Sequence, residues 1–187
     1  MLSVTQTIPD HGEICENNIS GEFYMTKDIL VRVRGTQTIG EEEDTVEMIT
    51  PGTYYEKNGK QYFIYDESLD ETGEPTHNTV KIMENRIEVT KRGLVDSHMI
   101  FEPGKRTTAN YRTPMGLFLM GITTSFLEIA EDEESILLKI KYSMEMNGQY
   151  AFDCSTEILA SSKKDEVLGI VVKTKNVTCY FSRMGIS

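Results

Sequence analysis

Basic side chains are the residues of this chain whose types and spacing point most directly to chemistry, in this case to anion binding. The chain is acidic, with a formal net charge of −11, yet its middle concentrates several cations, namely Arg32, Arg34, Arg92, Lys105, Arg106 and Arg112. Arg32 and Arg34 are two residues apart, so on a β-strand their side chains point the same way. Two guanidinium groups on one face, with Tyr111 or Arg112 nearby, could hold a carboxylate or a phosphate by paired hydrogen bonds.

The face on which the first two arginines lie decides whether such a site exists. Val31 and Val33 alternate with these arginines, and if the valines fill the core, the arginines lie outside and pair with surface carboxylates. We favour this outer placement, although the alternation of a single strand does not settle which face is internal. The candidate ligand-binding residues are Arg32, Arg34, Arg92, Tyr111 and Arg112.

Catalytic chemistry has little support in the sequence. Asp96 and His98 would lie on one face of a strand while Ser97 points to the other, which breaks a Ser-His-Asp arrangement. We interpret Asp96 and His98 as a polar pair on a solvent face, and Cys154 as a buried, inert thiol. The three histidines share no metal-ligand spacing. We therefore predict no catalytic residue, no metal site and no cofactor.

The elements that must position these residues are β-strands, because apolar and polar residues alternate with a period of two through the middle of the chain. Asn58-Gly59 and Asn147-Gly148 are typical of type I′ hairpins, since asparagine and glycine adopt positive φ at low cost. Pro103-Gly104 marks another turn. We also expect an acidic turn from Glu41 to Asp44 and a solvated loop at residues 66–76.

The last three predicted strands, at residues 116–130, 134–147 and 149–160, are long enough that an open sheet would leave extended edges exposed. Closing the sheet removes these edges, so we predict an all-β, up-and-down antiparallel barrel of about eight to ten strands. One apolar face is expected to run through Ile136, Leu138, Ile140, Tyr142, Met144 and Met146 and then through Tyr150, Phe152, Cys154, Thr156 and Ile158.

Residues 117–129 are apolar on both faces of their predicted strand. One face would carry Leu117, Leu119, Leu127 and Ile129, and the other Phe118, Met120, Ile122 and Phe126. Only one of these faces can fill the barrel. The other needs a cover, which could be a terminal tail, a second subunit or a ligand.

The barrel domain is expected at residues 27–160, between two tails. Residues 1–26 hold four acidic residues and no Lys or Arg, which is typical of a disordered tail. Gly21-Glu22 can be encoded by a purine-rich, ribosome-binding sequence, so an alternative is that translation starts at Met25. Residues 161–187 form a C-terminal extension in which Val167 to Val172 could add a strand. The sequence favours neither a tail that packs on the barrel nor one that does not.

Composition narrows the setting and the partners. Hydrophobic residues make up 39% of the 187 residues and charged residues 26%, which is typical of a globular domain. The net negative charge argues against nucleic-acid binding, and no apolar run is long enough for a membrane span. Three widely spaced cysteines indicate reduced thiols, and no signal peptide is evident. We therefore expect a cytoplasmic protein.

Three functions fit these observations to different degrees. The leading interpretation is a non-enzymatic protein that binds a small, partly apolar ligand in the barrel, with an anionic group on the ligand if the arginines face inward. The ten methionines could line such an adaptable pocket, although methionines more often fill gaps in a core. The second interpretation is a structural or interaction protein that forms a homodimer through the barrel wall. An enzyme of unknown type has the least support.

Four segments form a combination more specific than any one of them, and they are Lys27 to Gln37, Thr50 to Tyr55, Met99 to Lys105 and Tyr111 to Gly116. Together they make the chain from Asp28 to about Ala160 resemble the YwiB-like family of bacterial β-barrel proteins of unknown function. The resemblance implies a calycin- or lipocalin-like barrel, a cytoplasmic setting and a start near Met25. It implies no activity, because none is established for the family.

Overall fold

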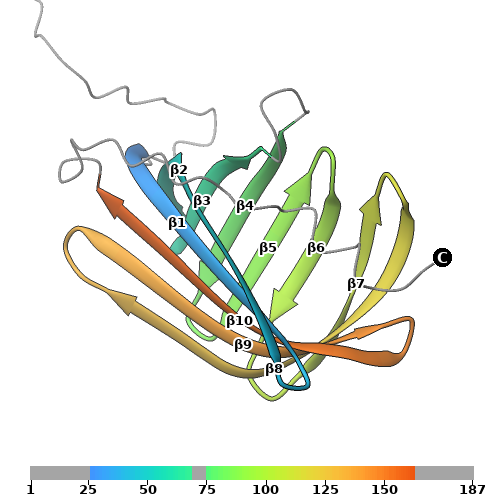
Figure 1. Cartoon of the computed structure of the whole chain (residues 1–187). Helices are drawn as coiled ribbons and strands as arrows, with labels where there is room; N and C mark the ends of the chain where they lie inside the picture. Colours follow the sequence, from blue (N-terminus) through green and yellow to red (C-terminus); the bar gives the residue numbers. More distant parts are fainter. Residues whose placement is uncertain (1–25, 69–74, 163–187) are drawn as a thin grey trace, which may run out of the picture.

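The computed structural model describes residues 26–68 and 75–162, and every regular element in these residues is a β-strand (Figure 1). No helix in this part of the chain is long and apolar enough to cross a membrane. The predictions for residues 1–25 and for the C-terminal extension from residue 163, including the extra strand, lie outside the described residues.

Ten strands follow one another along the described chain. The first five are β1 (Thr26–Ile39), β2 (Glu42–Lys57), β3 (Lys60–Glu67), β4 (Thr76–Met83) and β5 (Arg86–Arg92). The other five are β6 (Asp96–Phe101), β7 (Arg106–Thr113), β8 (Gly116–Glu131), β9 (Ser135–Met146) and β10 (Gln149–Ser162). The acidic turn is shorter than predicted, because Gly40 at φ 61° allows a two-residue turn with Glu41, so that Glu42 already pairs in β2.

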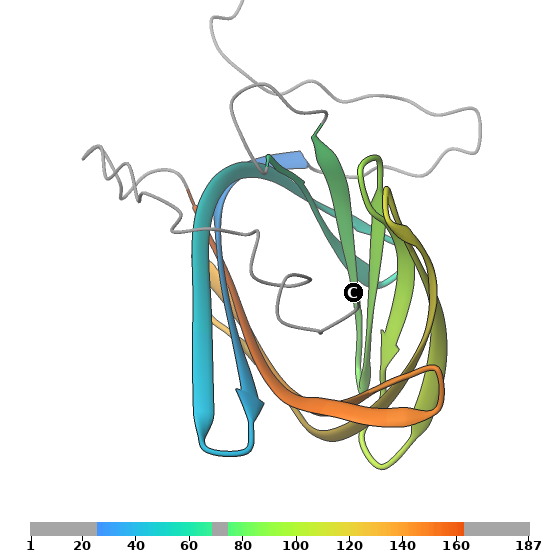
Figure 2. The ribbon, with the colours of Figure 1, turned by 45° about the vertical axis from the view of Figure 1, so that its right-hand side comes forward.

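Each strand pairs antiparallel with its neighbours in sequence, and β1 pairs with β10, which closes the sheet into a barrel. The closing ladder runs from Ile29 opposite Ser162 to Thr38 opposite Asp153. Figure 2 looks into the barrel and shows the strands surrounding its interior. The prediction of an up-and-down antiparallel barrel is therefore confirmed, and every described strand has a partner on both sides.

Both asparagine-glycine turns lie where the sequence predicts them. Asn58 and Asn147 have φ values of 54° and 50°, the left-handed conformation that a type I′ hairpin requires. Asn147, between β9 and β10, also contacts β8, because its N–H donates to the Leu119 carbonyl at 2.9 Å. Its side-chain oxygen accepts the Leu119 N–H at 3.4 Å. This turn is thereby fixed against the neighbouring strand.

Side chains at alternate positions fill part of the barrel interior. The fully buried hydrophobic residues are Phe63, Ile87, Ile122, Leu138, Ile140, Val31 and Val80. In β4 the alternation is regular, since Thr76, Asn78, Val80 and Ile82 are buried and the residues between them are not. Inward and outward positions therefore follow the strand period along most of the barrel.

An irregularity in β8 exchanges the inner and outer faces of residues 117–129 partway along the strand. The register shifts between Thr124 and Phe126, where β8 holds one residue more than β9. Before this bulge Met120 and Ile122 are buried, whereas after it Phe126 is exposed and Leu127 packs against the core. The prediction that Phe126 shares the face of Ile122 was therefore wrong, because an inserted residue exchanges the two faces.

A second bulge corrects the predicted face of β10. The register shifts between Tyr150 and Phe152, so Tyr150 lies opposite Glu145 on the outside while Phe152 lies opposite Met144 inside. Tyr150 is exposed, and it does not continue the inner face as its position two residues before Phe152 predicted. Cys154 and Ile158 are buried, as predicted.

Candidate functional site

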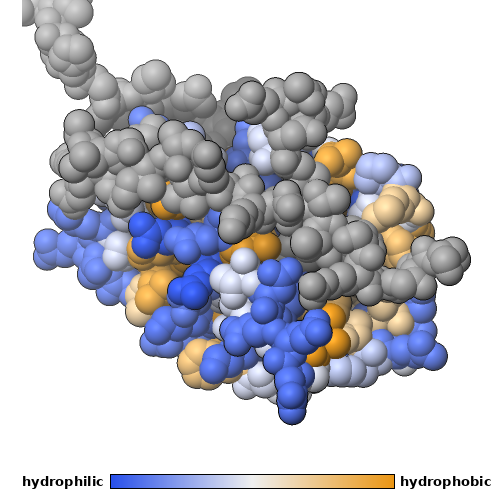
Figure 3. All heavy atoms as spheres, in the orientation of Figure 1, coloured by the Kyte–Doolittle hydropathy of each residue, from blue (hydrophilic) through white to orange (hydrophobic). Residues whose placement is uncertain are grey.

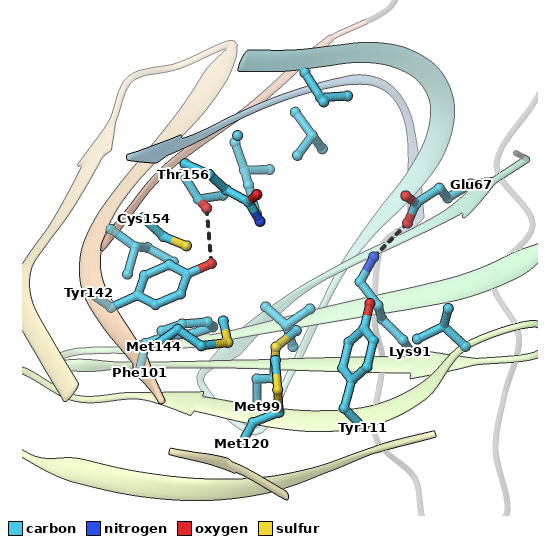
Figure 4. A pocket seen from close by; sticks show the side chains of 18 of the residues that line it. Glu67, Lys91, Met99, Phe101, Tyr111, Met120, Tyr142, Met144, Cys154 and Thr156 are labelled. Carbon is cyan, nitrogen blue, oxygen red and sulfur yellow. Dashed lines mark hydrogen bonds and ion pairs between the residues drawn. The ribbon is translucent and has the colours of Figure 1, made fainter. Parts of the chain in front are cut away.

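The side chains leave part of the barrel interior open, as a cavity of about 260 Å³ (Figure 4). All ten strands contribute to its wall, which is mainly apolar. Five methionines line it, and they are Met48, Met99, Met120, Met144 and Met146. Their unbranched, polarisable side chains give the wall a surface that can adapt to the shape of a small molecule.

Period-two alternation carries a cation and a carboxylate onto this wall. Lys91 follows Ile87 and Val89 on the inner face of β5, and Glu67 follows Phe63 and Tyr65 on the inner face of β3. Both charged side chains lie among the residues that line the cavity.

Lys91 and Glu67 form an ion pair, with 2.5 Å between Nζ and Oε2. Their side chains are only 20% and 22% exposed, so both charges are largely withdrawn from water. An isolated charge at such a depth would be costly, and the pairing offsets this cost. The same carboxylate oxygen accepts a longer hydrogen bond of 3.5 Å from Nδ2 of Asn78.

A row of cross-strand neighbours surrounds Lys91 on the inner surface. Asn78 lies opposite Lys91, Lys91 opposite Ser97, and Ser97 opposite Tyr111. Oδ1 of Asn78 and Oγ of Ser97 are buried and have no hydrogen-bond partner in residues 26–68 and 75–162. Unpaired buried polar atoms are uncommon in folded proteins, so this row is a distinct polar region of a mainly apolar interior.

Hydroxyl groups lie on the opposite wall of the cavity. The Tyr142 hydroxyl and Oγ1 of Thr156 are 3.5 Å apart, and the Tyr142 ring packs on Phe101 with 4.9 Å between centroids. Figure 4 shows these hydroxyls on one side of the cavity, Lys91 and Glu67 on the other, and the methionines between them. The cavity therefore offers polar groups on two sides of an apolar centre.

Cys154 lies beside these hydroxyls on the cavity wall. Burial raises the pKa of its thiol to about 12, so the nucleophilic thiolate is scarce at neutral pH. Burial likewise raises the pKa of Tyr65 well above its usual range. Both groups are therefore neutral hydrogen-bonding groups of the wall, and this agrees with the interpretation of Cys154 as an inert thiol.

The structure separates the five candidate ligand-binding residues. Tyr111 lines the cavity, whereas Arg32, Arg34, Arg92 and Arg112 are exposed and do not. Arg32 lies 3.6 Å from Glu47 on the outer wall, and Val31 takes the buried position beside it. The outer placement favoured from the sequence is the one observed, so the arginines do not form an anion site in the interior.

Sequence reasoning missed Lys91 and Glu67, although a signal was present. Each residue lies two positions beyond a run of buried, alternating apolar residues, where the period continues the inner face. Their pairing was not readable, because they are 24 residues apart in the sequence and meet only through the register of three strands.

Asp96 and His98 lie on the outside of β6, as predicted, with Ser97 buried between them. Nδ1 of His98 shares a 2.9 Å hydrogen bond with Oγ1 of Thr90, and Asp96 accepts the Gly93 N–H at 3.2 Å. Each side chain is thus engaged with a separate partner rather than with the other. Within the described ranges no group of His, Cys, Asp and Glu is arranged to hold a metal ion.

Comparisons with known proteins agree with this fold. The pattern of a protein family described as a domain of unknown function (DUF1934) matches residues 31–158. The uncharacterized β-barrel protein YwiB of Bacillus subtilis (strain 168) is 29% identical over 107 residues, which cover 57% of this chain and 74% of that protein. The crystal structure of the B. subtilis YwiB protein matches with a TM-score of 0.66 and 23% identity, over 73% of this chain and 92% of that one. The structural match shows a shared fold.

Proposed function

Because the chain belongs to the DUF1934 family, a group of unknown function that includes YwiB-like barrels, we propose a function from the barrel itself. The protein is a non-enzymatic binder that takes up a small, partly apolar ligand in the barrel interior, in a cytoplasmic setting. The resemblance to YwiB-like barrels inferred from the sequence is confirmed, and it adds no activity.

The observation that carries the proposal is the cavity. A cavity of about 260 Å³ with apolar, aromatic and thioether walls and a few converging polar groups is typical of small-molecule sites. Closely packed protein interiors rarely leave such space without a use. The candidate arginines lie outside the cavity, so they give no reason to expect an anionic group on the ligand.

The test is native mass spectrometry of the full chain purified directly from cells, compared with two variants. Val33→Phe places a ring in the cavity wall, and Ile64→Phe adds the same ring on the exposed side of β3. We expect a co-purifying small molecule with the wild type and Ile64→Phe, and its loss with Val33→Phe. A wild-type protein that is free of any small molecule, and that also fails to take one up from a cell extract, would overturn the proposal.

We also propose a second function, homodimerisation through the barrel wall, which one observation favours. Leu117 and Leu119 on the outer face of β8 are 59% and 51% exposed, and Met115 and Tyr150 are exposed as well. Figure 3 shows apolar side chains gathered over β7 and β8, at the right-hand edge of the view. Exposed apolar side chains that lie together on one strand favour association.

Sedimentation velocity distinguishes this second function from ligand binding. If the outer strip is an interface, the wild type sediments as a dimer and Leu117→Glu/Leu119→Glu sediments as a monomer. The ligand-blocking variant Val33→Phe remains a dimer, because its ring lies inside. A wild type that is monomeric at the highest soluble concentration would exclude the homodimer.

A further inference from the structure

The ion pair inside the cavity determines the chemistry of the ligand more closely than the cavity volume does. Lys91 is the one lysine or arginine among the cavity-lining residues of the described chain, and Glu67 is the one carboxylate. Because the two are paired at 2.5 Å, the wall presents no net charge. A bound anion would have to compete with Glu67 for Lys91, and a bound cation would have to compete with Lys91 for Glu67.

The two oxygens of Glu67 have different surroundings. Oε2 accepts hydrogen bonds from both Lys91 and Asn78, at 2.5 Å and 3.5 Å. Oε1 receives no hydrogen bond from residues 26–68 or 75–162. Lys91 and Asn78 thus hold the carboxylate in place from one side and leave an acceptor atom available in the cavity wall.

The neighbouring polar atoms also need hydrogen-bond partners. Oδ1 of Asn78 and Oγ of Ser97 are buried without one in the described part of the chain. Both lie directly across from Lys91 in the strand register. The lining itself therefore offers Oε1 of Glu67 as an acceptor that no described residue uses, and Asn78 and Ser97 add buried polar atoms next to the lining, the serine hydroxyl being able to donate as well as accept.

We infer that the ligand is an uncharged molecule with a hydrogen-bond donor, such as a hydroxyl group, that it directs at Oε1 of Glu67, and that Glu67 is the specificity-determining residue. This inference rests on the proposed function. The apolar body of the ligand lies on the methionines, and a second polar group can reach the Tyr142 and Thr156 hydroxyls on the opposite wall.

Three probes with one ring system separate the possible chemistries. 2-Naphthol has a donor, 2-methoxynaphthalene has only an acceptor, and 2-naphthoate is an anion. Isothermal titration of the full chain at pH 7 should show 2-naphthol binding about tenfold more tightly than 2-methoxynaphthalene, because a hydrogen bond to a carboxylate is gained. 2-Naphthoate should bind most weakly, since Lys91 is already neutralised.

Substitution of Glu67 should reverse this order. In Glu67→Gln, Lys91 loses its counter-charge, so 2-naphthoate should gain about tenfold in affinity, while the preference for 2-naphthol should shrink because a neutral amide oxygen accepts a weaker hydrogen bond than a carboxylate. Glu67→Gln/Lys91→Gln removes both charges and tests the same point if the single variant is unstable. It should weaken the preference for 2-naphthol without gaining affinity for 2-naphthoate. Glu88→Gln is the matched control, since Glu88 pairs with Lys81 at 3.3 Å on the outer face of β4 and β5.

The outcomes separate the inference from the function on which it rests. Equal affinity of the wild type for 2-naphthol and 2-methoxynaphthalene, or tighter binding of 2-naphthoate, would overturn the inference and leave the proposed binding function intact. A Glu88→Gln variant that changed the order as Glu67→Gln does would also overturn it. If no naphthalene binds, and phenol, anisole and benzoate do not bind either, the inference fails, and the proposed function fails with it if native mass spectrometry also finds no small molecule on the wild-type protein.

Discussion

Arg106 of β7 and Glu145 of β9 form an ion pair across the strand that separates them, with 2.6 Å between Nη2 and Oε2. Between them passes Gly121 of β8, where an added Cβ would lie 2.7 Å from Arg106 Nη2 and 2.8 Å from Glu145 Oε2. The absence of a side chain at Gly121 therefore lets the pair tie three strands together on the outer wall. Met120, the residue directly before Gly121, lines the cavity.

The first prediction concerns the pH dependence of this pair. The hydrogen bonds that Arg106 donates lower the pKa of Glu145. A carboxyl group whose pKa is lowered by folding stabilises the protein above its unfolded pKa, about 4.3 for glutamate, and loses this contribution as the pH falls through the folded value. The difference in free energy of unfolding between the wild type and Arg106→Gln should be complete at neutral pH and should shrink at acid pH.

Urea titrations of both proteins at several pH values measure this difference. The salt dependence provides a control, because the pair is exposed and high ionic strength should reduce the difference at neutral pH. A difference that stayed the same from neutral to strongly acid pH would show that Arg106 stabilises the wall by packing rather than by charge.

The second prediction concerns the turn between β5 and β6. Gly93 has φ 125°, and a Cβ there would lie 2.5 Å from the Pro75 carbonyl oxygen. Gly93→Ala should therefore lower the free energy of unfolding by about 2–3 kcal/mol, through both backbone strain and the contact. The control is Gly40→Ala, because Gly40 has φ 61° and nothing within 4 Å of a Cβ. This change should cost only about 1 kcal/mol. Equal costs in urea unfolding would contradict the role of Pro75.

The third prediction tests the inner and outer faces of β3 with adjacent residues. Phe63 is fully buried, whereas Ile64 is 39% exposed on the outer wall. Phe63→Ala should lower the free energy of unfolding by about 3–5 kcal/mol, because it leaves a void in the core. Ile64→Ala should cost about 1 kcal/mol or less. Chemical denaturation of the two variants gives the comparison, and a larger cost for Ile64→Ala would reverse the faces described for this strand.

These two residues also illustrate what the sequence can predict. Regular alternation assigns Phe63, Val31 and Leu138 to the interior without further information, because in a strand the side-chain direction follows from position alone. The asparagine-glycine turns at Asn58 and Asn147 are equally local, since two residues determine the backbone conformation.

The features that sequence reasoning missed depend on partners distant in the chain. The bulges before Phe126 and Phe152 add one residue to one strand of a pair, so they become visible only when the partner strand is known. Lys91 and Glu67 were missed for a related reason. A charged residue at the end of an alternating run resembles a solvated strand end, and only the register of β3, β4 and β5 brings the two charges together.

The last prediction concerns the reactivity of Cys154 inside the cavity. Burial raises the pKa of this thiol to about 12, so at pH 8 the reactive thiolate makes up only on the order of one part in ten thousand. In Cys15→Ser/Cys179→Ser, which leaves Cys154 as the remaining cysteine, iodoacetamide should label the native protein slowly. The rate should rise by several orders of magnitude in urea, where the thiol regains its ordinary pKa.

Peptide mass spectrometry at timed intervals measures this labelling. Because Cys154 lines the cavity, a ligand bound there should slow the native reaction further, and it should leave the rate in urea unchanged. Labelling of the native protein at the rate of a small free thiol would contradict the buried, protonated state of Cys154. A ligand that slows labelling of Cys154 in the wild type but not in the Val33→Phe variant binds in the barrel rather than on its outer wall.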